Sequence, residues 1–310
     1  MIPKPPPAEG RLGFVYVPPF RVQGVSVAGE ATSIHCPELD VCFDMGACPR
    51  AALASKYACI SHGHMDHIGG LAYWCSQRQF QGMGPGTIVC DPRIEDDVRG
   101  MMEGFVKLER QRTPYEIITL DEGGELEIKN NIAMRAFHTE HTCPSVGYVV
   151  HEKRTKLKPE YNGMPQEKLR ELKQGGTEIV NNLEVPLVAY MGDTLPGPHL
   201  VREDVRKAQI IVTECTFFEP EHKERAKVGM HLHVDDIAEW LKVCECEAMI
   251  ITHVSRRTHM QYARKRLTEV AGRVLANKVL FLMDHRANKT RYEHQAEEAR
   301  VREEELAARA

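Results

Sequence analysis

The most informative part of the sequence is Ser61-His62-Gly63-His64-Met65-Asp66-His67-Ile68-Gly69-Gly70. It follows an apolar run, Tyr57-Ala58-Cys59-Ile60, which is typical of a buried strand. Residues two apart on an extended segment point the same way, so His62 and His64 can aim at one metal ion. Asp66 and His67 follow where the chain turns toward a helix, so they can aim at a neighbouring point. This order of side chains predicts a loop that supplies ligands to two metal ions.

The donor types suit zinc, because imidazole nitrogen and carboxylate oxygen are both common zinc ligands. Two ions roughly 3.5–4 Å apart can lower the pKa of a shared water to about 7 and can bind both the attacking and the leaving oxygen of an in-line displacement. A histidine-rich surface loop that binds nothing is the alternative, and the tight spacing argues against it. We therefore predict a hydrolase with two Zn²⁺ per subunit, in which Mn²⁺ or Fe²⁺ can replace zinc.

Later strand ends must supply the remaining ligands, since one loop cannot complete two sites. His141, Asp193 and His253 each follow an apolar run, at residues 135–137, 187–191 and 248–252. Such runs are typical of buried strands that deliver a polar side chain to one edge of a sheet. The predicted metal ligands are His62, His64, Asp66, His67, His141, Asp193 and His253.

Taken together, these residues resemble the metallo-β-lactamase superfamily and, within it, the short form of tRNase Z (ribonuclease Z), the tRNA 3′-processing endoribonuclease. The resemblance runs from about Val22 to about Leu282. Its more specific part lies in three segments that resemble the family's His-Glu-Ala-Thr, His-Ser-Thr and Ser-x-Gly-Tyr motifs: Thr213–Phe217, Gly229–His233 and Thr142–Tyr148.

The resemblance implies an α/β fold, the metallo-β-lactamase αββα sandwich of two mixed β-sheets flanked by helices. It also implies a division of the ligands: His62, His64 and His141 for the first ion, Asp66, His67 and His253 for the second, and Asp193 as the bridge. Its catalytic residues would be Asp66, Glu214 and His231, the last two moving a proton to the leaving oxygen. From the residues alone, a buried structural carboxylate and a helix cap remain alternatives for Glu214 and His231.

The substrate implied by the resemblance is precursor tRNA, cut after the discriminator base to leave a 3′-hydroxyl, and the assembly is a homodimer. The segment His253–Arg257 lacks the aromatic residues usual there in the family. Only a modest insertion is expected between Tyr148 and Asp193, in place of the long arm that grips tRNA. A dinuclear hydrolase of the same fold that acts on a small phosphodiester or sulfate ester is the alternative. A non-catalytic, metal-stabilised RNA-binding protein is a third, which the full ligand set disfavours.

The net charge of −4 conceals two basic concentrations, near residues 151–173 and 256–266. Local phosphate neutralisation matters more to RNA affinity than net charge, although most charge runs are only solvated faces. The predicted substrate-binding residues are Arg256, Arg257, Ser145, Lys156 and Lys158. We expect His138 either to pack against neighbouring side chains or to contact a metal ligand from behind. His233 lies on the same side as His231, so we expect it near the substrate.

The 310 residues suffice for one large domain. We predict an N-terminal lead over 1–21, a hydrolase domain over 22–284 and a charged helix over 285–310. The 10 cysteines show no paired framework, which indicates reduced thiols in a cytoplasmic protein. No apolar run reaches the length of a membrane span, so no membrane partner is expected.

The pattern also predicts where the regular elements lie. Two short strands are expected within 22–43, and further strands at 115–120, 126–128, 132–137 and 146–150, which form a second set, and within 178–191. Helices are expected at 67–79, 92–110, 165–174, 234–243, 260–276 and 292–310. In the second of these helices, Met101 and Met102 are expected in the core.

Overall fold

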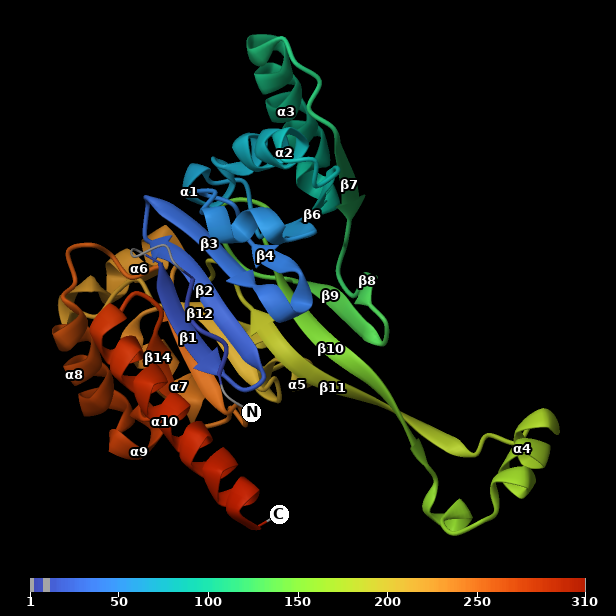
Figure 1. The fold of residues 1–310 in the computed structure, drawn as a ribbon. Coiled ribbons are helices and arrows are strands. Elements are labelled where there is room, and N and C mark those ends of the chain that lie inside the picture. Colours follow the sequence, from blue (N-terminus) through green and yellow to red (C-terminus); the bar gives the residue numbers. More distant parts are fainter. Residues whose placement is uncertain (1–2, 8–11, 310) are drawn as a thin grey trace.

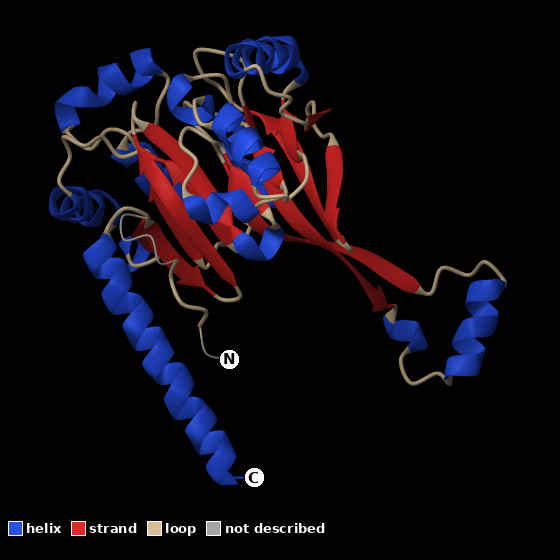
Figure 2. Ribbon diagram, turned by 45° about the horizontal axis from the view of Figure 1, so that its top comes forward, coloured by secondary structure: helices blue, strands red, loops and turns tan. Residues whose placement is uncertain are grey.

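Two seven-stranded β-sheets form the centre of the molecule, with helices on their outer faces (Figures 1 and 2). The structure is a computed structural model that describes residues 3–7 and 12–309. Parts of the predicted lead and Ala310 lie outside the described residues. The arrangement is the αββα sandwich that the sequence predicts.

The first sheet contains the strands of the N-terminal part, in the order β1 to β7. Its β1–β4 pairings are antiparallel and its β4–β7 pairings are parallel. The strands are β1 Gly13–Val17, β2 Phe20–Val27, β3 Ala31–Cys36, β4 Val41–Phe43, β5 Tyr57–Cys59, β6 Gly86–Cys90 and β7 Tyr115–Thr119.

The second sheet repeats this plan, in the order β14 to β8. Its β11–β14 pairings are parallel and its β8–β11 pairings are antiparallel. The strands are β8 Glu125–Lys129, β9 Ile132–His138, β10 Val146–Leu157, β11 Val180–Tyr190, β12 Ile210–Glu214, β13 Ala248–Thr252 and β14 Val279–Phe281.

The main core lies between the two sheets, where Phe43 of the first sheet stacks on Tyr190 of the second with ring centroids 4.8 Å apart. A second core joins the outer face of the first sheet to α2 and α3, around Trp74 and Met102. A third joins the second sheet to α7 and α8, around Trp240 and Leu267. This burial on both faces explains the continuous apolar runs of the parallel strands.

The helices lie mainly in the connections between strands. The α-helices are α1 Met65–Ile68, α2 Leu71–Phe80, α3 Glu95–Glu109, α4 Gln166–Gln174, α5 Glu203–Arg206, α6 Lys223–Gly229, α7 Val234–Leu241, α8 Met260–Ala271, α9 Arg273–Ala276 and α10 His285–Arg309. Short 3₁₀ helices span Pro37–Leu39, Arg50–Ala54, Pro92–Ile94, Pro159–Tyr161, Pro198–Val201 and Pro220–His222. Most of these begin with proline, whose fixed φ suits a first helical position. No described helix has both the length and the apolar character that crossing a membrane requires.

A long arm projects from the second sheet, which corrects the expectation of only a modest insertion (Figures 1 and 2). β10 and β11 remain paired as far as Leu157 and Val180, and α4 lies at the tip. β9 accompanies them only as far as Glu152. The apolar pattern ends where this third strand ends, because a two-stranded ribbon in solvent buries little, and the outer half therefore shows no strand signal.

Several element predictions are also corrected. Residues 22–43 hold parts of three strands, and β1, buried throughout, lies inside the predicted lead. The helix expected at 67–79 is split into α1 and α2 near Gly70, and β7 joins the first sheet instead of the second. The core position of Met102 is confirmed, and Met101 packs on the same core.

The start of the charged C-terminal helix α10 packs on β1. The rings of Tyr292 and Phe14 meet edge to face at 5.5 Å, and Gln295 Nε2 donates to the carbonyl of Tyr16 at 3.2 Å. Beyond these contacts the helix extends away from the sandwich (Figure 1).

Candidate active site

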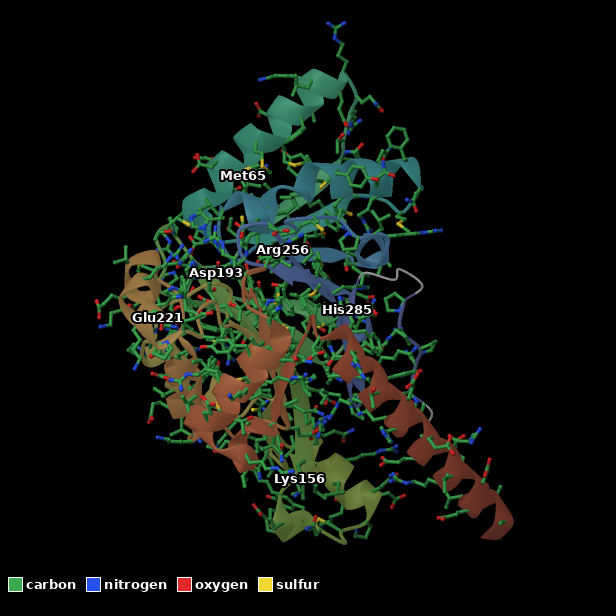
Figure 3. The ribbon with its side chains drawn as sticks, turned by 90° about the vertical axis from the view of Figure 1, so that its left-hand side faces the viewer. Met65, Lys156, Asp193, Glu221, Arg256 and His285 are labelled. Atoms are coloured by element: carbon green, nitrogen blue, oxygen red, sulfur yellow. The ribbon has the colours of Figure 1, made fainter. Side chains whose placement is uncertain are left out.

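The sequence-predicted ligands converge at one edge of the sandwich. Those from the first sheet lie on the loop after β5 and in α1, and those from the second sheet follow β9, β11 and β13. Met65, Asp193 and Arg256 lie in the same region of the molecule, whereas Lys156 lies far from them on the arm (Figure 3).

The first predicted set is closely spaced. His64 Nδ1 lies 3.1 Å from His62 Nε2 and 3.2 Å from His141 Nε2. Three ring nitrogens therefore face a common point, as the alternation along residues 62–64 predicts.

The second set meets around Asp193, which is buried. Asp193 Oδ2 lies 3.2 Å from His67 Nε2 and 3.2 Å from His253 Nε2. Asp66 Oδ2 lies 3.3 Å from the same His253 nitrogen. The ligand atoms of Asp193, His62 and His67 all lie within 4.8 Å of one another. Asp193 is therefore close to a histidine of each set.

His253 reaches this point through an unusual backbone conformation. Its φ is 54°, in the left-handed region that a non-glycine residue seldom adopts. Its amide donates to Ser26 Oγ of the first sheet at 2.8 Å, which holds the turn directly after β13. This local strain aims the ring at Asp193, and strain of this kind is common at functional sites.

The opposite nitrogens of these histidine rings are held by neighbouring groups. The distances are 2.9 Å from His62 Nδ1 to Ser61 Oγ, 2.7 Å from His67 Nδ1 to Asp44 Oδ2, 3.0 Å from His141 Nδ1 to the Met230 carbonyl and 2.9 Å from His253 Nδ1 to Thr216 Oγ1. Such partners fix the tautomer and leave the inward nitrogen as a metal donor.

Asp44 contacts the predicted ligand His67 and was not among the residues predicted from the sequence. It is fully buried and accepts hydrogen bonds from the Ser61 amide at 2.6 Å, the Ser61 hydroxyl at 2.8 Å and Tyr190 at 2.5 Å, besides that from His67. A signal was present, because Asp44 follows the apolar β4 just as the predicted ligands follow their strands.

The donor set fits divalent metal ions. His67 Nε2 is buried, and although Asp193 Oδ2 lies 3.2 Å away, this nitrogen makes no hydrogen bond with any described residue, which is costly unless another partner takes its place. Burial lowers the pKa of His62 to about 2, so its ring is a neutral donor. Burial opposes a charge on His67 too, but the carboxylates of Asp193 and Asp44 outweigh it and raise its pKa. Dense carboxylate and imidazole donors of this kind suit zinc, manganese or iron.

Glu214 and His231 form a pair next to the ligands. His231 Nδ1 lies 2.9 Å from Glu214 Oε1 and 3.9 Å from Asp193 Oδ2. Glu214 also accepts from the Thr194 amide at 3.0 Å and from Thr216 Oγ1 at 2.6 Å. Burial alone would lower the pKa of His231, but the Glu214 carboxylate raises it to about 9. The pair can therefore hold a proton at the edge of the site.

The predicted substrate-binding residues are dispersed. Arg256 and Arg257 are exposed and line a groove beside His253, whereas Lys156 and Lys158 lie on the arm. Ser145 is a correction, because it is buried and its hydroxyl pairs with Thr139 Oγ1 at 2.7 Å, out of reach of a substrate.

Two further histidines are also placed by the structure. His233 is buried and caps α7, with Nε2 3.0 Å from the carbonyl of Glu219, so the expectation that it touches substrate is wrong. His138 is half-buried, with Nε2 3.0 Å from Asp121 Oδ1 and 3.7 Å from Asp91 Oδ2, which are carboxylates outside the predicted ligand set.

Comparison with known proteins agrees with this geometry. The β-lactamase superfamily domain matches residues 49–254. The chain is 32% identical to the chloroplastic tRNase Z TRZ2 of Arabidopsis thaliana over 260 residues, 83% of this chain and 73% of the relative. It is 35% identical to tRNase Z TRZ1 of the same plant over 242 residues, 77% of this chain and 86% of the relative.

Among solved structures, the short form of human tRNase Z (ELAC1) shares the fold. Its TM-score is 0.54 at 17% identity, over 79% of this chain and 93% of the human one. Membership of the superfamily implies divalent-metal binding, in agreement with the His and Asp clusters described above. The chain belongs to the tRNase Z family of the β-lactamase superfamily.

Proposed function

We propose that this protein is a zinc-dependent endoribonuclease that removes the 3′ trailer from precursor tRNA and leaves a 3′-hydroxyl on the tRNA. The observation that carries the proposal is the Glu214–His231 pair, which lies beside the ligand cluster with His231 Nδ1 3.9 Å from Asp193. The Arabidopsis relatives named tRNase Z support it.

Two zinc ions per subunit are proposed, with Mn²⁺ or Fe²⁺ as substitutes. His62, His64 and His141 would hold one ion, and Asp66, His67 and His253 the other, with Asp193 between them. When bound, the ions would supply an activated water and neutralise charge on the phosphate.

The protein's own groups would handle the proton. His231 would donate it to the 3′-oxygen that leaves the phosphorus, because a departing alkoxide must be protonated. Glu214 would fix the ring and stabilise its charged form, and the Thr194 amide and Thr216 hydroxyl hold Glu214 in turn. Asp66 is oriented for the metal centre by the Gly29 amide, which donates to Oδ2 at 2.9 Å.

Large-substrate binding would use the groove and the arm. Arg256 and Arg257 would meet backbone phosphates near the cut, and Lys156 and Lys158 would meet phosphates further along the tRNA.

We also propose a homodimer, from the family resemblance, and sedimentation of a single monomeric species at micromolar concentration would contradict it. The cytoplasmic location remains a prediction from the sequence.

Hydrolysis of a small phosphodiester or sulfate ester is the alternative function. The arm favours the larger substrate, because its outer half contributes nothing to the core and is useful only for contacts outside it. A non-catalytic RNA-binding role is disfavoured by the complete set of donors.

The proposal is tested by incubating the zinc-loaded protein with a 3′-extended precursor tRNA and mapping the cut to the nucleotide. We expect one cut after the discriminator base. His231→Ala should lower turnover about 10²- to 10⁴-fold without loss of metal, because only the proton donor is removed. His138→Ala is the control, since His138 is a half-buried histidine whose ring lies beside Asp121, outside the predicted ligand set. Hydrolysis of a small phosphodiester without any tRNA cleavage would overturn the proposal.

A further inference from the structure

A groove of about 650 Å³ opens beside the Glu214–His231 pair. Phe217 lines it, together with Arg225, Arg256, Arg257 and His222. Thr216 also lines it, and the Thr216 hydroxyl contacts both Glu214 and His253. The groove therefore adjoins the catalytic edge through Thr216.

The Phe217 backbone is held by hydrogen bonds, and its side chain is not part of the core. Its carbonyl accepts from the Val234 amide at 2.9 Å, and its backbone forms an isolated bridge with His233. The neighbouring Phe218 is buried and packs on Phe281, whereas Phe217 stays partly exposed. Its ring centroid lies 6.1 Å from that of His231.

Cationic side chains surround this ring. The Arg225 guanidinium lies over Phe217 at 5.7 Å from the ring centroid. Arg256 pairs with Glu30, and His222 lies 3.2 Å from Glu219. In the part of the chain that the structure describes, neither Arg225 nor Arg257 has a carboxylate within ion-pair distance. An aromatic platform with free guanidinium groups is the usual chemistry for an unpaired nucleotide of RNA.

We propose that the groove binds the nucleotide that carries the leaving 3′-oxygen, with its base stacked on Phe217 and its phosphate near Arg256 and Arg257. The inference rests on the proposed function, because it uses His231 as the donor to that oxygen. The ribose bearing the oxygen must then lie at His231, and its base is attached to the same sugar. Phe217 lines the groove with its ring centroid 6.1 Å from that of His231, and because Arg225 lies over one face of the Phe217 ring, the base would stack on the other face.

Binding without cleavage gives the first test. The probe is an acceptor-stem RNA hairpin that ends in 2-aminopurine with a free 3′-hydroxyl, whose fluorescence falls when the base stacks. We expect quenching by the wild-type protein and by Phe217→Tyr, and its loss with Phe217→Leu. Phe105→Leu is the matched control, since Phe105 is an exposed phenylalanine on α3. Absence of quenching by the wild type, or equal quenching by Phe217→Leu, would overturn the proposal.

Cleavage kinetics give the second test. Phe217→Leu should lower kcat/KM for precursor tRNA about 10- to 100-fold, the range expected for one lost base stack. On a substrate whose last retained nucleotide is abasic, wild type and Phe217→Leu should be equal. If Phe217→Leu lowered kcat/KM on the abasic substrate as much as on precursor tRNA, Phe217 would act by supporting the protein structure and not by stacking on the base. Phe217-dependent quenching by a protein that cuts no precursor tRNA would refute the proposed function but keep the nucleotide site.

Discussion

At the scale of single residues, Asp44 shows how a group outside the ligand set controls it. Its carboxylate orients His67 directly and His62 through Ser61. Asp44→Asn replaces one accepting oxygen by an amide that cannot accept from His67. We expect the affinity for zinc to fall about 10- to 100-fold, as is typical when a partner behind a ligand is lost. Competition with a fluorescent chelator measures this change.

Asp91→Asn is the control for that experiment. Asp91 is equally buried, and it binds Arg93 through bonds of 2.6 and 2.8 Å instead of a ligand. Both variants remove one buried carboxylate, so both should lose some stability, but only Asp44→Asn should lose zinc. Equal zinc affinity in the two variants would contradict the role given to Asp44.

At the scale of elements, the arm carries the clearest prediction. Lys156 lies in β10, on the arm far from Asp193 (Figure 3), and Lys158 directly follows this strand. Replacing both by glutamine should weaken precursor tRNA binding and reduce the slope of log affinity against log salt by about 1 to 2, since each phosphate contact contributes about 0.7 to 0.9. Filter binding across a salt series measures both quantities.

Lys107→Gln on α3 provides a matched surface charge. Lys107 is exposed and pairs with Glu103 of its own helix, at 3.7 Å. The same change in salt slope for this variant would mean that the effect reflects net charge, and the arm would then have no special role.

At the scale of the whole molecule, the ligand cluster joins the two sheets. His62, His64, Asp66 and His67 belong to the first sheet's connections, and His141, Asp193 and His253 to the second's. Zinc that binds only the folded state at a thousandfold excess over its Kd adds about 4 kcal/mol to the free energy of unfolding. Chelation should therefore lower the Tm by roughly 10 °C, as scanning calorimetry can measure.

Asp193→Ala tests whether the shift comes from this cluster. Without the residue that lies between the two sets, the Tm of the variant should respond far less to chelator. Metal loss from the wild type must first be verified. If the Tm of the wild type is then unchanged, the two halves of the sandwich hold together without the ions.

Local signals in the sequence predict the order of the metal-binding side chains, whereas the fold class and the roles of Glu214 and His231 are predicted from the resemblance to the tRNase Z family. Alternation places His62 and His64 on one side of a strand end, and an apolar run before a polar residue marks Asp193 and His253 as groups at a sheet edge. Each of these inferences needs only a few consecutive residues and the geometry of a strand.

The role of Asp44, the burial of Ser145, the arm and the groove became visible only in the folded molecule, because the contacts that form them join segments distant in the sequence. Asp44 gained its role from a hydrogen bond to His67, and Ser145 lost its predicted role because Thr139 and the surrounding packing cover it. The arm escaped detection because β10 and β11 stabilise each other by backbone pairing, which leaves no apolar period in a ribbon surrounded by water. The groove at Phe217 likewise forms only where Ser255–Thr258 and α6 meet after folding.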